Sequence, residues 1–157
     1  MKLKDHIAQH IIDVHMGDNW TDVNIKNTLQ NISLQEAVTV TSSSANTIAA
    51  LLHHITFYNE VVLERLKGNI PFISDVNGFD VPALIKEDDW LELQEKNYQS
   101  AQNLAEAVKQ FPEEKLFEPV IANHSTVYKT LHGIIEHTHY HLGQIVIIKN
   151  LVKFQPR

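Results

Sequence analysis

Three histidines lie within five positions near the end of the chain, in the stretch EHTHYHLGQI of residues 136–145. Imidazole nitrogens are common ligands of divalent transition metals. In a β-strand, His137, His139 and His141 would all project from the same face. In an α-helix only residues three or four apart are neighbours, so only His137 and His141 would meet. The secondary structure therefore decides which histidines could share a metal ion.

The apolar residues around this stretch favour a helix. Leucine, isoleucine and valine recur with a period of about 3.6 over about 25 residues, far longer than a usual strand of about 5–6. A helical projection that sets His137 at zero puts His141 about 40° away, on or beside the buried stripe, and His139 at about 200°. We therefore expect His137 and His141 to point inward and His139 to lie on the outer face.

A third inward histidine is expected on a second helix, over residues 46–67. Of the adjacent pair in this helix, His54 shares its face with Tyr58 and several apolar residues, whereas His53 points toward the side that carries Glu60. Together with the pair on the later helix, His54 completes a set of three imidazoles. Three neutral nitrogen ligands with a fourth position open are the usual arrangement of a catalytic divalent metal.

The other histidines have simpler explanations. His6 and His10 are also four residues apart, but such a pair alone is weak evidence for a metal site. His15, His124 and His132 are expected to be solvated or to lie in loops.

Two polar side chains fall near the open position of the expected site. Tyr58 lies one turn after His54, and Gln144 lies two turns after His137. Either residue could orient a bound water or substrate, or instead make a hydrogen bond that packs two helices. A threonine follows His137, so the His-Glu-x-x-His motif that gives zinc peptidases their general base is missing.

The pattern of apolar residues predicts an all-α fold, a four-helix bundle with long crossover connections, in one domain spanning residues 1–157. Gly17 and Gly68 are expected to end helices, and the serine cluster at 42–44 to cap one. Trp20 is expected to line the pocket or to close one end of the bundle. The expected long helices are 3–16, 46–67, 88–110 and 127–152, with helical turns near 25–29 and 34–38 and a long connection over 69–85.

The composition of the chain argues against several kinds of partner, location and chemistry. The chain has 157 residues, a formal net charge of −6 and only 13 lysines and arginines, which are scattered, so nucleic acid is not expected as a partner. No signal peptide and no apolar run long enough to span a bilayer stands out, so a cytoplasmic protein without membrane attachment is expected. There is no cysteine. A disulfide framework, a thiolate ligand and a cysteine nucleophile are thereby excluded.

Four motifs resemble the DinB-like superfamily of metal-binding four-helix bundles, which is related to bacillithiol and mycothiol S-transferases. The motifs are Gly17-x-x-Trp20, Leu34-x-x-Ala37, Leu51-x-His53-His54-Ile55 and Glu136-His137-x-x-x-His141-x-Gly143-Gln144-Ile145.

This resemblance implies that His54, His137 and His141 bind a divalent metal such as zinc, nickel, iron or manganese. It also implies homodimers, and a low-molecular-weight thiol that the metal activates. Two functions follow as hypotheses. The first is a metal-dependent thiol S-transferase or hydrolase acting on a small-molecule substrate, and the alternative is a non-catalytic metal- or ligand-binding stress-response bundle.

Overall fold

The computed structural model describes residues 2–154, and the regular secondary structure of this part of the chain is helical. It has no strand, only two isolated β-bridges, so the expected all-α class is confirmed. No helix in it is both long and apolar enough to cross a membrane. The elements are α1 (Leu3–Met16), α2 (Ile25–Leu29), α3 (Leu34–Ala37), α4 (Ile48–Leu66), α5 (Glu87–Gln110), the 3-10 helix η1 (Glu113–Lys115) and α6 (Val127–Lys153).

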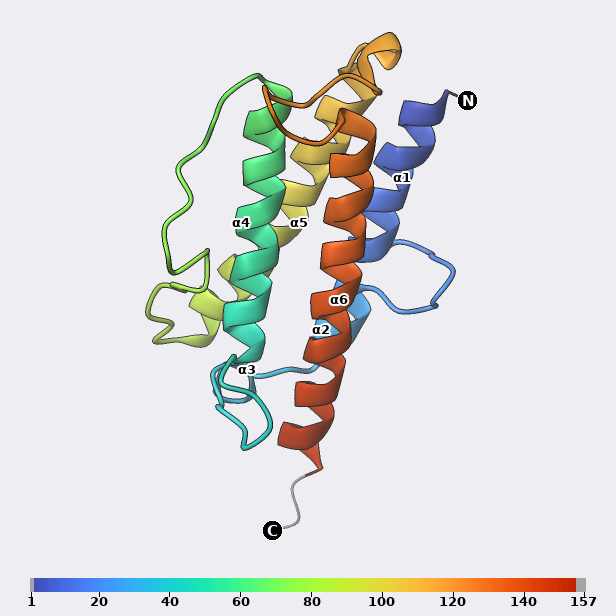
Figure 1. Cartoon of the computed structure of the whole chain (residues 1–157). Helices are drawn as coiled ribbons and strands as arrows, with labels where there is room; N and C mark the ends of the chain where they lie inside the picture. Colours follow the sequence, from blue (N-terminus) through green and yellow to red (C-terminus); the bar gives the residue numbers. More distant parts are fainter. Residues whose placement is uncertain (1, 155–157) are drawn as a thin grey trace.

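The four long helices pack side by side. Helix α5 contacts α1 and α4, and α6 contacts α4 and α1. Figure 1 shows that α1 and α6 run in one direction and α4 and α5 in the other. Because α4 and α5 are parallel neighbours, the chain has to return along the length of the bundle between them. It does so through residues 67–86, which descend beside α4 (Figure 1).

Threonine side chains begin the two helices that carry the expected site. The Thr47 hydroxyl accepts from the backbone N–H of Ala50, and the Thr126 hydroxyl accepts from that of Lys129. These bonds satisfy backbone donors that a first helical turn leaves free. The expectation that the serine cluster caps α4 was wrong, because Thr47 holds the cap position and Ser44 bonds to the backbone of Asn46 before it.

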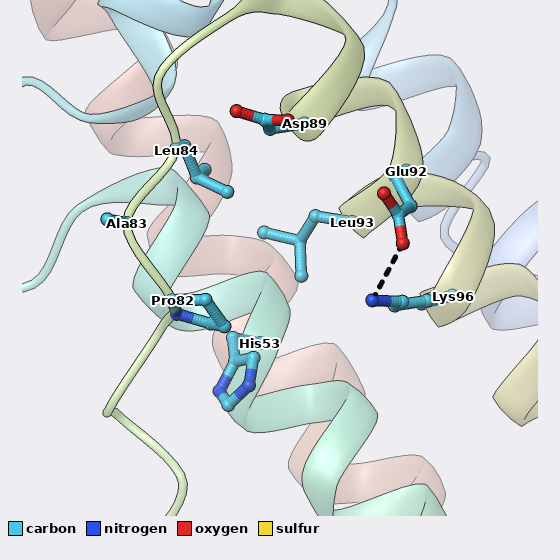
Figure 2. A pocket seen from close by; sticks show the side chains of 8 residues that line it. All are labelled: His53, Pro82, Ala83, Leu84, Asp89, Glu92, Leu93 and Lys96. Atoms are coloured by element: carbon cyan, nitrogen blue, oxygen red, sulfur yellow. Dashed lines mark ion pairs between the residues drawn. The ribbon is translucent and has the colours of Figure 1, made fainter.

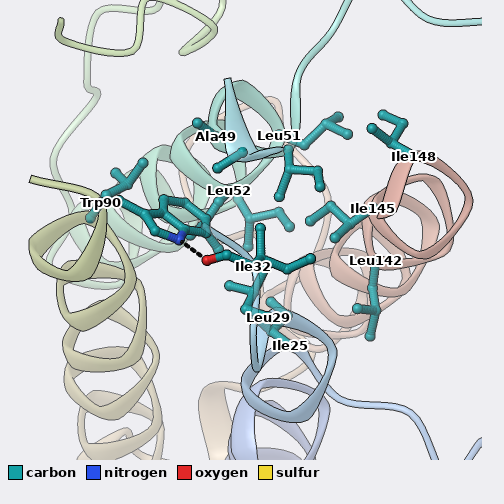
Figure 3. Packing of buried hydrophobic residues seen from close by; sticks show 14 of the residues in the cluster. Ile25, Leu29, Ile32, Ala49, Leu51, Leu52, Trp90, Leu142, Ile145 and Ile148 are labelled. Atoms are coloured by element: carbon teal, nitrogen blue, oxygen red, sulfur yellow. Dashed lines mark hydrogen bonds between the residues drawn. The ribbon is translucent and has the colours of Figure 1, made fainter. Parts of the chain in front are cut away.

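The apolar core consists of two clusters, one toward each end of the bundle. In one cluster (Figure 3) the fully buried Trp90 packs with leucines and isoleucines of α2, α4 and α6, and its Nε1 donates to the backbone oxygen of Ile32 at 2.8 Å. The other joins α1, α5 and the first half of α6. On α4 the change from one cluster to the other falls between Ile55 and Val62. The buried polar residues Thr56 and Asn59 lie within this junction, and His54 lies directly before it.

His15 is buried rather than solvated, contrary to expectation. It is 1% exposed; its Nδ1 donates to the backbone oxygen of Ile11 at 2.8 Å, and its Nε2 accepts from Asn59 at 3.0 Å. The Asn59 amide also donates to the Ser100 hydroxyl at 3.0 Å, so α1, α4 and α5 share one buried polar chain. Burial lowers the pKa of His15 to about 4. His15 lies one turn after Ile11, so the helical period already placed it inward.

Trp20 does not take part in the core. It is 97% exposed, so it neither lines a pocket nor closes the end of the bundle. The loop after α1 is folded on itself by Asn19, whose side-chain amide donates to the backbone oxygens of Asp13 and Val23. The indole of Trp20 lies in solvent, whereas Trp90 is buried in the bundle.

Candidate metal centre

Three imidazoles converge between α4 and α6. The Nε2 atom of His54 lies 2.9 Å from Nε2 of His137, which lies 3.1 Å from Nε2 of His141. The ligand atoms of all three lie within 4.8 Å of one another, so the group could hold a metal ion. The helical spacing of four residues brings His137 and His141 to the same face of α6, and α4 supplies His54. The structure thus brings together the three histidines that the sequence singled out.

Hydrogen bonds at Nδ1, the ring nitrogen that points away from the cluster, orient two of these imidazoles. Nδ1 of His54 donates to the backbone oxygen of Asn77 at 2.7 Å, and Nδ1 of His141 donates to Oε1 of Gln144 at 2.7 Å. A neutral imidazole has one N–H, so a hydrogen at Nδ1 leaves a lone pair at Nε2. Both lone pairs therefore point at Nε2 of His137.

The third imidazole cannot supply a proton to each of its neighbours. Nε2 of His137 carries at most one hydrogen for two contacts, and its Nδ1 is buried without a hydrogen-bond partner among the described residues. A divalent cation at the centre would accept all three lone pairs. Nitrogen ligands at about 2.0–2.1 Å from a tetrahedral zinc lie about 3.3 Å apart, close to the separations found here. The three residues therefore fit a divalent metal.

The environment keeps these imidazoles neutral. Burial lowers the pKa of His54 and that of His141, and it lowers the pKa of His137 to about 4, where the neighbouring His141 and His54 add to the effect. The lowered pKa values favour the neutral form of each ring, which has one N–H and one nitrogen with a free lone pair. A cation would then not have to displace protons to reach their lone pairs.

Aromatic rings enclose the centre on the α4 side. The Phe79 ring stacks on His54 with centroids 4.0 Å apart and an interplanar angle of 12°. The Tyr58 ring lies 5.0 Å from His54 and 4.9 Å from His137, and its hydroxyl donates to Oδ1 of Asn77 at 2.5 Å. Tyr58 therefore fixes the crossover loop at Asn77, and this residue in turn orients the His54 ring.

The two polar residues expected at the open position are thus both beside the centre. Gln144 bonds to His141, and Tyr58 bonds to Asn77, which bonds to His54. Gln144 thus orients one imidazole directly, and Tyr58 contacts the residue that orients another.

A family comparison bears on the same residues. The model of the DinB superfamily matches residues 18–145, a span that contains all three converging histidines. The chain belongs to the DinB superfamily. The resemblance inferred from the sequence motifs is therefore confirmed. Searches of curated proteins and of solved structures gave no significant match.

Sequence reasoning missed the loop that supports the centre in this DinB superfamily protein. Asn77 and Gly78 both have positive φ, 53° and 74°, and they present consecutive backbone oxygens to two consecutive histidines of α4. Nδ1 of His53 donates to Gly78 at 2.8 Å, as that of His54 does to Asn77. An Asn-Gly pair signals a turn, but nothing local says on which helix the turn packs.

His53 lies outside the histidine cluster, as expected. Figure 2 shows it at the edge of a separate pocket between the crossover segment and α5, where an ion pair of 2.9 Å joins Lys96 to Glu92. The pocket has a volume of about 190 Å³. The hydrogen bond of His53 to Gly78 connects it to the turn that also holds His54.

His139 is also outside the cluster, but the expectation of an outer-face position was wrong. Its ring is half-buried and lies 6.1 Å from the ring of His10 on α1. Its Nδ1 donates to the backbone oxygen of Ile135 at 3.2 Å, and its Nε2 is buried. Helix α6 packs against α1 as well as α4, so its buried surface extends beyond the side that faces His54.

Proposed function

We propose that this DinB superfamily protein is a divalent-metal-dependent enzyme in which His54, His137 and His141 hold the metal and leave one coordination position open. The observation that carries the proposal is the convergence of three Nε2 atoms. Hydrogen bonds cannot account for both of their close contacts, because Nε2 of His137 has at most one hydrogen to donate. A dication held by neutral ligands lowers the pKa of a water or thiol bound to it. Zinc, nickel, iron and manganese are all candidates.

The surroundings of the centre favour a thiol over water as the activated group. The cluster contains histidines only, without an aspartate or glutamate among the described residues. Glu136 is exposed, and the hydroxyl of Tyr58 is engaged by Asn77. A hydrolase would lack an evident general base, whereas a thiol, with an ordinary pKa of about 8.5, needs less help to ionise. The chain has no cysteine, so the thiol would be a small molecule that attacks an electrophilic substrate, as family membership suggests.

A groove offers small molecules access to the centre. It has a volume of about 200 Å³, lies between α4 and α6 and ends at His137 and Tyr58. These two residues would contact a substrate at the open position. Hydrolysis remains the second reaction to test, and a cytoplasmic location and a homodimer remain predictions.

The alternative function is a non-catalytic metal- or ligand-binding bundle of a stress response. The absence of an acidic side chain from the cluster, as far as the structure describes the chain, favours it, because such a site can bind a metal without a residue that moves protons. The two functions differ in whether the metal keeps a position that exchanges with solvent or substrate.

Metal binding is tested first, with protein purified without an affinity tag. Elemental analysis should find about one divalent ion per chain, and a chelator should lower the melting temperature, because a ligand bound only by the folded state stabilises it. His141→Ala should abolish both effects. His139→Ala is the matched control, since it removes a histidine of the same helix that lies outside the cluster.

Activity is tested next on the metal-loaded protein. Consumption of monochlorobimane that depends on an added thiol would support a transferase, and ester hydrolysis on the same sample would support a hydrolase. Loss of either activity in His141→Ala but not in His139→Ala would tie it to the centre. Cobalt-substituted protein whose absorption spectrum does not respond to any thiol would have a closed metal site, and it would contradict the enzyme proposal in favour of the alternative.

A further inference from the structure

The groove that ends at the candidate metal centre carries a cationic residue at its other end. Along α4, Tyr58, Val62 and Arg65 line it, spaced four and three residues apart and so on one face of the helix. Along α6, Thr130, Gly133, Ile134 and His137 line it in the same way. The two helices are antiparallel (Figure 1). The lining residues therefore place the groove along the seam between them, from His137 to Arg65.

Arg65 has no anionic partner among residues 2–154. The ion pairs found there join other residues, and no hydrogen bond satisfies its buried Nε. Lys67, two residues later, differs, because it pairs with Glu64 at 2.7 Å. A guanidinium stays charged at any physiological pH and presents a fork of donors that suits carboxylates and phosphates. A half-buried, unpaired arginine in a groove is therefore suited to an external anion.

The remaining lining leaves room for such an anion. Within the described part of the chain, no acidic residue lines the groove. Gly133 has no atom within 4 Å of the position that a Cβ would take, so the groove is open beside it. Thr130 adds a hydroxyl at the end where Arg65 lies. Tyr58 and Arg65 are seven residues apart, which is about 10 Å along a helix.

We propose that the small molecule that reaches the metal centre carries an anionic group, a carboxylate or another oxyanion, that binds Arg65, about two helical turns along the groove from Tyr58. This inference rests on the proposed function for its metal-bound end. The anion site itself requires only the groove and Arg65. The two can therefore fail separately.

A series of ω-mercapto acids tests the proposal on cobalt-loaded protein. In 6-mercaptohexanoate the thiolate would bind the metal, giving a charge-transfer band, and the carboxylate would reach toward Arg65. Its dissociation constant should be lower than that of uncharged 6-mercaptohexanol by about tenfold or more. The advantage should shrink for 3-mercaptopropionate, which is too short. Equal affinities for the acid and the alcohol would overturn the proposal.

Variants locate the charge that is responsible. Arg65→Gln should remove the preference for the acid, whereas Lys67→Gln, which removes the same charge from an exposed site, should keep it. Arg65→Lys should keep part of the preference, and it serves as the test if the glutamine variant does not fold. A preference that persists at full strength in either Arg65 variant would assign the anion to another residue and contradict the proposal.

A metal-free measurement separates this inference from the proposed function. Hexanoate titrated into the metal-free protein and followed by NMR should bind with a dependence on Arg65, even if weakly. Arg65-dependent binding in a protein that takes up no cobalt would uphold the anion site and refute the metal centre. A protein that binds cobalt and thiols but shows no effect of Arg65 in either titration would refute the anion site alone.

Discussion

His54 donates its Nδ1 hydrogen to the backbone oxygen of Asn77 at 2.7 Å, and this bond ties α4 to the crossover segment. The next residue, Gly78, accepts a hydrogen bond from His53, and the ring of Phe79 stacks on the ring of His54. Asn77 and Phe79 thus fix the position, tautomer and tilt of the His54 imidazole, and Gly78 between them holds His53. The crossover, which first serves to connect two parallel helices, also supports the candidate centre.

The bond between Tyr58 and Asn77 should contribute measurably to stability. Tyr58→Phe removes the donor, Asn77→Gly removes the acceptor while tolerating the positive φ of 53°, and the double variant removes both. We expect a coupling free energy of about 0.5–1.5 kcal/mol from a double-mutant cycle in urea. Additive effects would show that the hydroxyl is equally well hydrated without Asn77.

Gln144 should matter for metal affinity through His141. Its Oε1 accepts the Nδ1 hydrogen of His141 at 2.7 Å and so presents Nε2 to the centre. Gln144→Leu should weaken metal binding about 10–100-fold in a chelator competition assay, while Gln144→Glu, which keeps an acceptor oxygen, should bind at least as well as the wild type. An equal loss in both variants would argue for a packing role instead.

Much of the fold could be predicted because the relevant signals are local. The period of apolar residues placed α1 and α6 within one or two residues of their ends, and it separated His137 and His141 from His139 as neighbours. The same period, applied to His15 and Ile11, would have shown His15 to be buried. That error arose from treating isolated histidines as solvated.

The parts that could not be predicted depend on contacts between distant segments. Asn77 lies 23 residues from His54, and the choice of that turn as its partner follows from the parallel arrangement of α4 and α5. The coverage of His139 likewise depends on α1, more than a hundred residues earlier, packing against one flank of α6. Local periodicity carries no information on either.

Alanine substitutions at two glycines of the crossover test how much its turns depend on glycine, and Gly143 of α6 is the control. Gly143 is helical with no atom within 4 Å of the position that a Cβ would take, Gly68 has φ +86° with equally open surroundings, and Gly78 has φ +74° with the Phe57 ring 2.6 Å from that position. Gly143→Ala should stabilise by about 0.5–1 kcal/mol. Gly68→Ala should cost about 1 kcal/mol and Gly78→Ala about 2–3 kcal/mol or more, in urea unfolding.

The effect of these variants on metal binding should follow a different order. Only Gly78→Ala disturbs the backbone that holds His53 and His54, so only this variant should also weaken metal affinity. A loss of affinity in Gly68→Ala of the same size would contradict the assigned role of the turn at 77–78.

Acid should destabilise the protein through His15. The ordinary pKa of 6.5 falls to about 4 in the folded state, so between these values the unfolded chain binds a proton that the folded chain excludes. The contribution is therefore fully present above about pH 6.5 and falls as the pH drops, by about 3 kcal/mol in total. Urea unfolding of metal-free wild type and His15→Gln from pH 4 to 7.5 should show free energies of unfolding that converge toward low pH.

The other histidines with lowered pKa values affect wild type and variant alike, so they cancel in that difference. His124→Gln, which changes an exposed histidine, is the control. A curve for His15→Gln that runs parallel to the wild type would mean that the buried chain from His15 to Ser100 does not control the acid response.

The contrast between the two tryptophans gives this protein a built-in pair of optical reporters. Trp20 is 97% exposed and Trp90 is fully buried with its indole N–H bonded to Ile32. The native emission spectrum should be the sum of a red component, open to aqueous quenchers, and a blue component shielded from them. On unfolding, only the emission of Trp90 should shift strongly to longer wavelength. Trp20→Phe would thus leave a fluorescence signal that reports almost purely on the core around Trp90.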